Sequence, residues 1–165
     1  MILIGLGANL ASPEFGAPPG SLEAALRALQ KSGVRIVARS RWYRSAPVPA
    51  SSRPWFVNGV AAVETTLDPA ALLALLHEIE ARFGRVRRER NAARVLDLDL
   101  LDYEGRVSGP GDAPPILPHP RLGERAFVLR PLAEVSPHWR HPRSGIDVQA
   151  LLAGLSPEQT AEPIA

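Results

Sequence analysis

Two aspartates separated by one residue are the feature of this sequence that most strongly indicates chemistry. Asp97 and Asp99 lie in an otherwise apolar run over 94–101, in which leucines alternate with them. In a strand, alternate side chains point to one face, so both carboxylates would share a face at about 6.5–7 Å spacing along the backbone. Two such carboxylates repel each other unless a positive group lies between them. A divalent cation such as Mg²⁺, which also holds substrate phosphates, is a common occupant of such a pair.

The most basic stretch of the chain begins just upstream of these aspartates. It carries six arginines, namely Arg82, Arg85, Arg87, Arg88, Arg90 and Arg94. Guanidinium groups bind phosphate oxygens through paired hydrogen bonds, so a cation site beside them indicates polyphosphate chemistry. The local pattern alone leaves two other interpretations open. An Asp-x-Asp can lie on a solvated strand, and an arginine run can be a solvated loop.

Length and composition bound the class of protein. The chain has 165 residues, 45% hydrophobic and 22% charged, and we expect a single domain over 1–165. The absence of cysteine excludes disulfides, thiolate metal sites and a cysteine nucleophile. A net charge of +2 does not demand a nucleic-acid partner. The chain lacks signal-peptide features and any apolar run near the roughly 18 residues of a membrane span, so we expect a cytoplasmic protein without membrane contact.

Apolar periodicity predicts the strands that surround the aspartate pair. Strands are expected over 1–8, 34–45 and 55–66, with the aspartate strand as the fourth. The Arg-rich stretch 85–93 is expected to be a polar loop that could cover a site and move.

Capping residues predict the helices. Ser21 is expected to cap a helix over 22–32, and Asp68 followed by Pro69 is expected to begin a helix that ends at Gly84.

Further helical turns are expected beyond the aspartate strand. They cover 121–134, with an interruption at Pro131, and a last short helix follows Asp147. The tail from Ser156 is expected to be frayed. The order β-α-β-β-α-β predicts an α+β fold of the ferredoxin-like βαββαβ type, with helices packed on one sheet and additional C-terminal helices.

Several polar residues stand out against this framework. Asn58 is a lone amide in an apolar strand, so it either bonds the neighbouring backbone or binds a polar ligand edge. Glu80 lies in the last turn of a helix, where the helix dipole disfavours an anion unless an arginine or a ligand donor is near. His119, Arg121 and Arg125 are three possible phosphate donors, although a lone histidine is more often structural.

These residues fall within a set of motifs that resembles the 6-hydroxymethyl-7,8-dihydropterin pyrophosphokinase family of folate biosynthesis. The resemblance runs from residue 2 to about 150. It rests on Gly5-Leu6-Gly7-Ala8-Asn9-Leu10, Tyr43-Arg44-Ser45-Ala46-Pro47, Phe56-Val57-Asn58, Glu80 with Gly84-Arg85-Val86-Arg87, Arg94-Val95-Leu96-Asp97-Leu98-Asp99, and Pro118-His119-Pro120-Arg121 continuing to Arg125-Ala126-Phe127. The resemblance implies transfer of pyrophosphate from ATP to the pterin hydroxymethyl group, with release of AMP.

The family also implies roles for the residues that match its motifs. Asp97 and Asp99 would hold two Mg²⁺ ions, and Arg85 and Arg94 would contact the phosphates during catalysis. ATP would be bound by Glu80, His119, Arg121 and Arg125. The pterin would be bound by Ser45, Ala46, Val48, Phe56, Asn58 and Phe127, with the two phenylalanines on either side of its ring. The implied partners are therefore ATP and 6-hydroxymethyl-7,8-dihydropterin, and the expected state is a monomer.

The sequence departs from the family pattern at one place that concerns the site. Many members carry Trp-Gly-Pro-Arg before the aspartates, whereas this chain has Asn91-Ala92-Ala93-Arg94. Phe56 also stands where a tyrosine is common.

The competing interpretation is a ferredoxin-like module that binds nucleic acid through the 85–94 loop. The low aromatic content of 5% and the two aspartates disfavour that module.

Overall fold

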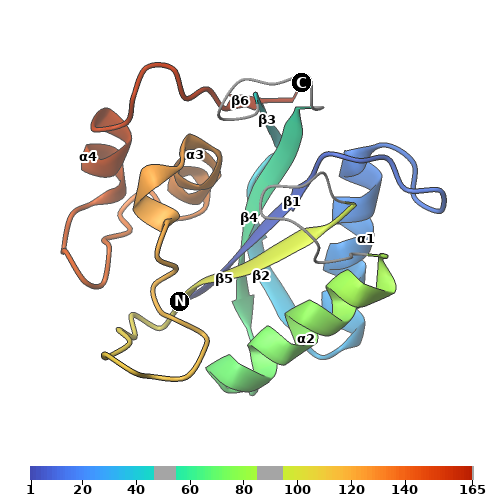
Figure 1. Ribbon diagram of the computed structural model, residues 1–165, viewed down its shortest axis with the longest axis horizontal. Coiled ribbons are helices and arrows are strands. Elements are labelled where there is room, and N and C mark those ends of the chain that lie inside the picture. Colours follow the sequence, from blue (N-terminus) through green and yellow to red (C-terminus); the bar gives the residue numbers. More distant parts are fainter. Residues whose placement is uncertain (47–54, 85–94, 165) are drawn as a thin grey trace.

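The computed structural model describes residues 1–46, 55–84 and 95–164, which form one sheet covered by helices on both faces (Figure 1). The strands are β1 (Ile2–Ala8), β2 (Arg35–Arg39), β3 (Tyr43–Ser45), β4 (Phe56–Glu64), β5 (Asp97–Tyr103) and β6 (Glu162–Pro163). The helices are α1 (Pro18–Lys31), α2 (Pro69–Arg82), the 3₁₀ turn η1 (Leu122–Glu124), α3 (Ala126–Val135) and α4 (Val148–Ala153). The arrangement confirms the predicted α+β class. Among the described helices, none is long and apolar enough to cross a membrane.

The sheet is antiparallel, with strand order β5-β1-β4-β3-β6 and β2 also paired with β4. The single strand predicted over 34–45 is wrong, because that segment forms β2 and β3 at opposite ends of β4. Ser40 lies between them, and its Oγ accepts a hydrogen bond from Val60 N at 3.0 Å. The Trp42 ring packs so closely on Gly59 that a Cβ there would lie 2.5 Å from it. The element order is therefore β-α-β-β-β-α-β before α3, and not the strict βαββαβ order.

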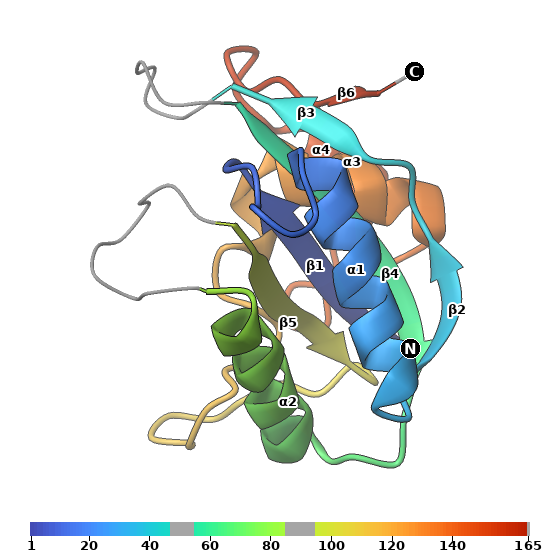
Figure 2. The same ribbon diagram turned by 90° about the vertical axis from the view of Figure 1, so that its right-hand side faces the viewer.

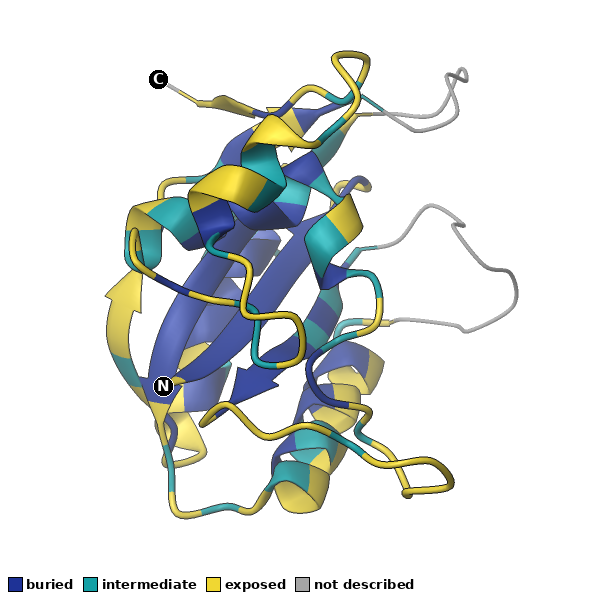
Figure 3. Ribbon diagram, turned by 90° about the vertical axis from the view of Figure 1, so that its left-hand side faces the viewer, coloured by how far each residue is buried: buried dark blue, intermediate teal, exposed yellow. Residues whose placement is uncertain are grey.

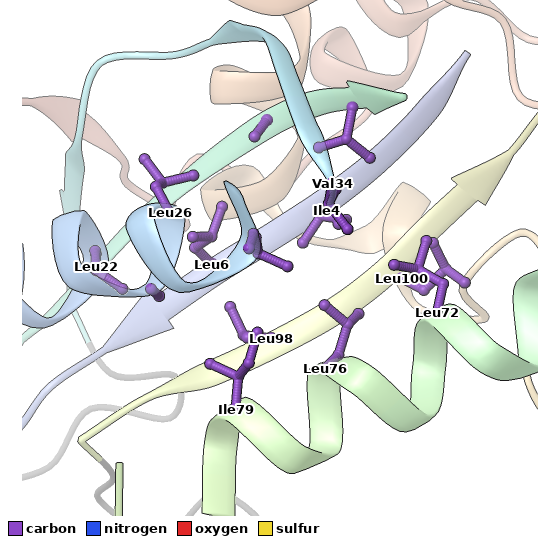
Figure 4. Close-up of a cluster of buried hydrophobic side chains, with 14 of the residues drawn as sticks. Ile4, Leu6, Leu22, Leu26, Val34, Leu72, Leu76, Ile79, Leu98 and Leu100 are labelled. Carbon is purple, nitrogen blue, oxygen red and sulfur yellow. The ribbon is translucent and has the colours of Figure 1, made fainter. Parts of the chain in front are cut away.

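Two apolar cores lie on opposite faces of this sheet. The larger core packs α1 and α2 against β1, β4 and β5, as Figure 2 shows with these helices in front of the strands. Its leucines and isoleucines interdigitate between helices and sheet (Figure 4). The smaller core lies under α3 and α4 and contains Leu3, Val60, Leu101 and Leu129. In Figure 3 the central strands are buried behind that second layer.

The helix starts show where capping rules succeed and fail. Asp68 caps α2 by accepting from Ala71 N at 2.8 Å, and Asp147 caps α4 by accepting from Ala150 N at 2.8 Å, as predicted. The prediction that Ser21 caps the first helix is wrong. Pro18 occupies the first helical position, where its missing N–H costs nothing. The helix therefore starts earlier, and Ser21 is buried inside it.

Two predictions near the C-terminus are also wrong. The helix α3 continues through Pro131, which is buried, because packing of the helix outweighs one lost hydrogen bond. The tail beyond Ser156 is not frayed, since β6 pairs with β3 and Ala161 is buried against Tyr43. Backbone pairing with an edge strand supplies the order that the tail's polar composition does not indicate.

Candidate active site

The two aspartates lie on one face of β5, as their spacing predicts. Asp97 pairs with Gly7 and Asp99 with Gly5 on the neighbouring β1, so no β1 side chain stands beside either carboxylate. Both aspartates are partly buried, whereas Leu98 and Leu100 between and beyond them lie in the larger core. The alternation of β5 thus separates a polar pair from the apolar interior.

Glu80 bonds the end of α2 to the strand that carries this pair. Its side chain is 1% exposed, and its Oε2 accepts a hydrogen bond from the Leu98 backbone N–H at 2.8 Å. Because β5 is at the edge of the sheet, that N–H points away from β1 and needs a partner. Glu80 supplies it midway between Asp97 and Asp99.

His119 approaches the aspartates from the segment that precedes η1. Its backbone N–H donates to Leu101 O at 2.9 Å, which fixes the segment against β5. Its Nδ1 accepts from Arg121 N at 3.2 Å, so a neutral ring carries its proton on Nε2, which lies 4.0 Å from Asp99 Oδ1. Burial, assisted by the charge of Arg125, lowers the pKa of His119 despite the opposing effect of Asp97. At neutral pH the ring is therefore mostly uncharged, and its approach to Asp99 is not an ion pair.

Arg125 brings positive charge to the same aspartates. It lies between η1 and α3, and its guanidinium carbon is 5.3 Å from the centroid of the Phe127 ring. Burial is the main cause that lowers the pKa of Arg125, while the nearby charge of Asp99 opposes the shift. Arg121 is close enough to repel both Arg125 and a protonated His119. The structure thus brings Arg121, Arg125 and His119 close to the aspartate pair.

A pocket of about 250 Å³ opens along the free edge of β5 beside these groups. Its walls come from α2, from β5, and from the loop that leads to His119. The lining residues are Leu73, His77, Asp97, Leu98, Asp99, Leu100, Pro114, Pro115, Ile116, His119 and Pro120. Sequence analysis missed Leu73, His77 and the 114–116 segment. Leu73 and His77 lie off the apolar stripe of α2, and a proline-rich loop carries no periodicity that tells which element it contacts.

The other predicted substrate residues lie on the same face of the sheet, at β3 and β4. Ser45 pairs with Phe56, and Tyr43 pairs with Asn58. Ser45 is 3% and Asn58 is 9% exposed. Within the described part of the chain, Ser45 Oγ and Asn58 Oδ1 are buried without a hydrogen-bond partner. The only other side-chain atom of this kind there is Ser21 Oγ, in α1, for which we have no physical account.

Gly7 connects the two ends of the site. It pairs with Asn58 on one side and with Asp97 on the other, so the three residues form one row across the sheet. A Cβ at Gly7 would lie 2.4 Å from Asn58 Nδ2, closer than atoms can approach. The absent side chain therefore provides the space that the Asn58 amide occupies.

Some of the remaining predicted site residues lie in the described part of the chain, and others lie outside it. Ala46 directly follows Ser45 and is partly buried, and Phe127 is partly buried at the start of α3. Arg85, Arg94 and Val48 lie outside the described residues, as does the altered segment Asn91–Ala93. Over residues 1–46, 55–84 and 95–164 there is no group of three or more His, Cys, Asp or Glu side chains that could hold a metal ion.

Comparison with known proteins places the chain among characterised relatives. The chain matches the family model described as 7,8-dihydro-6-hydroxymethylpterin-pyrophosphokinase (HPPK) over residues 3–137. It is similar to the 2-amino-4-hydroxy-6-hydroxymethyldihydropteridine pyrophosphokinase of Methylorubrum extorquens, with 43% identity over 81% of each chain. The enzyme of the same name from Pseudomonas aeruginosa is 41% identical over 92% of this chain and 90% of its own.

The fold has solved counterparts as well. The crystal structure of Plasmodium falciparum HPPK-DHPS with pteroate superposes on 92% of this chain with a TM-score of 0.73 and 13% identity. This chain spans 43% of that longer one. At this identity the likeness concerns the fold alone.

Proposed function

The chain belongs to the 7,8-dihydro-6-hydroxymethylpterin-pyrophosphokinase family, and we propose that it transfers pyrophosphate from ATP to the hydroxymethyl group of 6-hydroxymethyl-7,8-dihydropterin, releasing AMP, in folate biosynthesis. One observation carries the proposal beyond the family match. Two buried polar atoms without a hydrogen-bond partner among the described residues, Ser45 Oγ and Asn58 Oδ1, share a sheet face with the aspartate pair.

The pterin is proposed to lie at the β3–β4 end of this face. A pterin presents ring nitrogens, an amino group and a carbonyl at its edge, and these can satisfy Ser45 Oγ and Asn58 Oδ1. Leaving those atoms unsatisfied would cost about 1–3 kcal/mol each. This favours the ligand-binding interpretation of Asn58 over the backbone-bonding one. Phe56 and Phe127 offer aromatic faces for the ring, and Ala46 and Val48 are the other proposed pterin contacts.

The nucleotide is proposed to lie at the β5 end. The pocket beside β5, with its leucine and proline walls, suits a base, while His119, Arg121 and Arg125 suit the phosphates. Arg85 and Arg94, which lie outside the described residues, remain proposed phosphate contacts. Glu80 remains a predicted ATP residue. Its described hydrogen bond supports a second contribution, which is to hold β5 so that both aspartates face the phosphates.

Asp97 and Asp99 fit a hard divalent cation, because a pair of carboxylates with substrate phosphates is a usual ligand set for Mg²⁺. We propose that they hold two Mg²⁺ ions. When bound, these ions would neutralise the phosphate charge that opposes nucleophilic attack.

The chain's own residues are proposed to position the two substrates for this transfer. The substrate hydroxyl attacks the β-phosphorus in line and forms a new oxygen–phosphorus bond. The bond between the β-phosphorus and the oxygen that bridges it to the α-phosphate breaks, so AMP leaves and the hydroxyl proton is released to water. Arg125 and the Nε2–H of His119 offer donors to the phosphate oxygens from a partly buried site, where such contacts are strong. Asn58 and the aromatic rings hold the pterin so that its hydroxymethyl group faces the β5 end.

We infer a cytoplasmic monomer that has these two substrates as its partners and does not act on nucleic acid or membranes. The alternative of an RNA-binding module finds less support, because Asp97 and Asp99 on this face would repel a phosphate backbone and the chain is only 5% aromatic.

A coupled AMP assay tests the proposal. Purified protein with ATP, Mg²⁺ and 6-hydroxymethyl-7,8-dihydropterin should release AMP, and omission of the pterin or addition of EDTA should abolish release. Absence of AMP with all three components present would overturn the assignment. Salt-sensitive RNA binding without AMP formation would favour the binding module instead.

A further inference from the structure

The tail segment, residues 156–164, follows α4 and runs to β6, which lies beside β3 (Figure 1). Near its start, Gln159 N donates to Ser156 O at 3.0 Å, which forms a turn. Further on, Ala161 is buried against Tyr43 and Ala126. Glu162 and Pro163 pair with β3, and Ile164 N donates to Trp42 O at 2.9 Å. The tail is therefore packed against the two elements that carry Arg125 and Ser45.

Gln159 makes the polar contact of this segment with the nucleotide end. Its Oε1 accepts from Ala126 N at 3.0 Å, and its Nε2 donates to Glu124 O at 2.8 Å. These two backbone groups flank Arg125 on either side. One amide thus satisfies a donor and an acceptor across a single residue, with its carbonyl oxygen and its NH₂ group.

Arg125 is the single residue between η1 and α3, and its own carbonyl accepts from Leu129 N at 2.9 Å. It joins η1 to α3 with φ −122° and ψ 117°, which is extended backbone between two helical segments. Within the described residues, its own side chain does not cap α3. The orphan N–H groups of the first helical turn need acceptors, and Gln159 supplies one from 33 positions away in sequence.

The position of the Arg125 side chain depends on this backbone, and the side chain lies near the aspartate pair. The Arg125 guanidinium packs on the Phe127 ring and feels the charge of both aspartates. The arginine side chain is long, so a small rotation of the Arg125 backbone would displace its guanidinium much further than it displaces the Cα atom. Positioning errors of about 1 Å can cost on the order of 100-fold in rate.

We propose that Gln159 is a positioning residue for the pyrophosphoryl transfer, which acts by fixing the backbone on both sides of Arg125. The inference rests on the proposed function, since it assigns Arg125 to the ATP phosphates. It adds a residue beyond the 3–137 range of the family match, in a segment whose sequence predicted no order.

The test is a double-mutant cycle between Gln159 and Arg125. Gln159→Ala should lower kcat/KM for ATP by about tenfold, the effect of two lost hydrogen bonds, with a smaller change in KM for the pterin. Arg125→Ala should lower it further. Because Gln159 acts through Arg125, adding Gln159→Ala to Arg125→Ala should cause little further loss.

Matched variants separate this role from simple loss of structure. Glu158→Ala, one position away with an exposed side chain, should leave both kcat/KM and the unfolding midpoint unchanged. Gln159→Glu keeps the acceptor for Ala126 N but cannot donate to Glu124 O, so its activity should fall between those of the parent and Gln159→Ala. Affinity for a non-hydrolysable ATP analogue, measured by calorimetry, provides the same cycle if Arg125→Ala is too slow to assay.

The possible outcomes are distinct. If the wild-type protein is active and Gln159→Ala has the same kcat/KM for ATP, the positioning role is overturned and the proposed function stands. Fully additive losses in the cycle also overturn it, because they indicate a general effect of the tail on folding. An inactive wild-type protein overturns the proposed function itself, and the analogue-binding cycle then decides the Gln159–Arg125 coupling separately.

Discussion

The two faces of the sheet are built differently from the same strands. On the face covered by α1 and α2, β1 and β5 contribute Ile4, Leu6, Leu98 and Leu100, all buried in one apolar core. On the opposite face, apolar packing lies under α3 and α4, with a smaller cluster between Tyr43, Ala126 and Ala161. Elsewhere on this face, β1, β4 and β5 present Gly7, Asn58, Asp97 and Asp99.

The difference shows how a small domain keeps stability and chemistry apart. A strand's side chains alternate between faces, so one residue of a pair can be buried for stability while its neighbour faces a ligand. The helices α1 and α2 are each 14 residues long and cover their face of β1 and β5, whereas α3 has 10 residues and leaves the polar end to shorter segments. Substitutions on the two faces should therefore affect different measurements.

The largest effect is expected at the aspartate pair. Asp97→Asn or Asp99→Asn should lower kcat by about 10²–10³-fold, because an electrostatic contact with the transferring group is lost. The unfolding midpoint should change little, since both side chains are only partly buried. Steady-state kinetics with far-UV circular dichroism checks both points. Turnover within a few-fold of the parent would contradict the metal role.

The residue between the aspartates should show the opposite behaviour. Leu98 is 2% exposed in the larger core, so Leu98→Ala should lower the free energy of unfolding by about 2–5 kcal/mol. The backbone N–H that bonds Glu80 is retained, and kcat per folded molecule should stay within a few-fold of the parent. Urea denaturation and kinetics at low temperature measure the two quantities. A large loss of kcat in fully folded protein would mean that the faces are not independent.

The two glycines of β1 offer a matched pair on the polar face. Gly7→Ala would place a Cβ 2.4 Å from Asn58 Nδ2, so the amide must move, and we expect KM for the pterin to rise about tenfold. Stability should fall little, because the displaced atom is the end of a side chain. Gly5→Ala meets only Leu101 at 3.4 Å, an ordinary contact, and should be nearly silent. Equal effects of the two substitutions on KM would contradict the proposed role of Asn58.

The smallest effect concerns pH. Because burial lowers the pKa of His119 in the folded protein, the unfolded chain takes up this proton first as pH falls. The stability due to neutral His119 is full above the unfolded pKa of 6.5 and is lost as pH falls through the lowered folded pKa. His119→Asn, which keeps an acceptor for Arg121 N, should therefore be less sensitive to acid than the parent. Burial lowers the pKa of His141 in the same direction, and it is present in both proteins, so the difference isolates His119. Identical stability curves between pH 7.5 and pH 5 would contradict the burial of a neutral ring.

Local sequence determined a large part of this protein. The alternation of aspartate with leucine put both carboxylates on one face of β5 and opposite the core, and Asp68 and Asp147 specified their helix starts, because these effects involve residues only a few positions apart. The motifs shared with the pyrophosphokinase family pointed to Asn58, His119 and Arg125 without any knowledge of their neighbours.

Only the tertiary structure decided how distant segments meet. The division of 34–45 into two strands depends on Trp42 packing on Gly59, and the order of the tail depends on its pairing with β3. The same holds for the bond from Glu80 to Leu98 and for the contact of Gln159 with both neighbours of Arg125. Each of these joins groups at least 17 positions apart, as with Trp42 and Gly59. Such contacts form only when the sheet has assembled, since hydrogen-bond partners and close packing are properties of position in space and leave no period in the sequence.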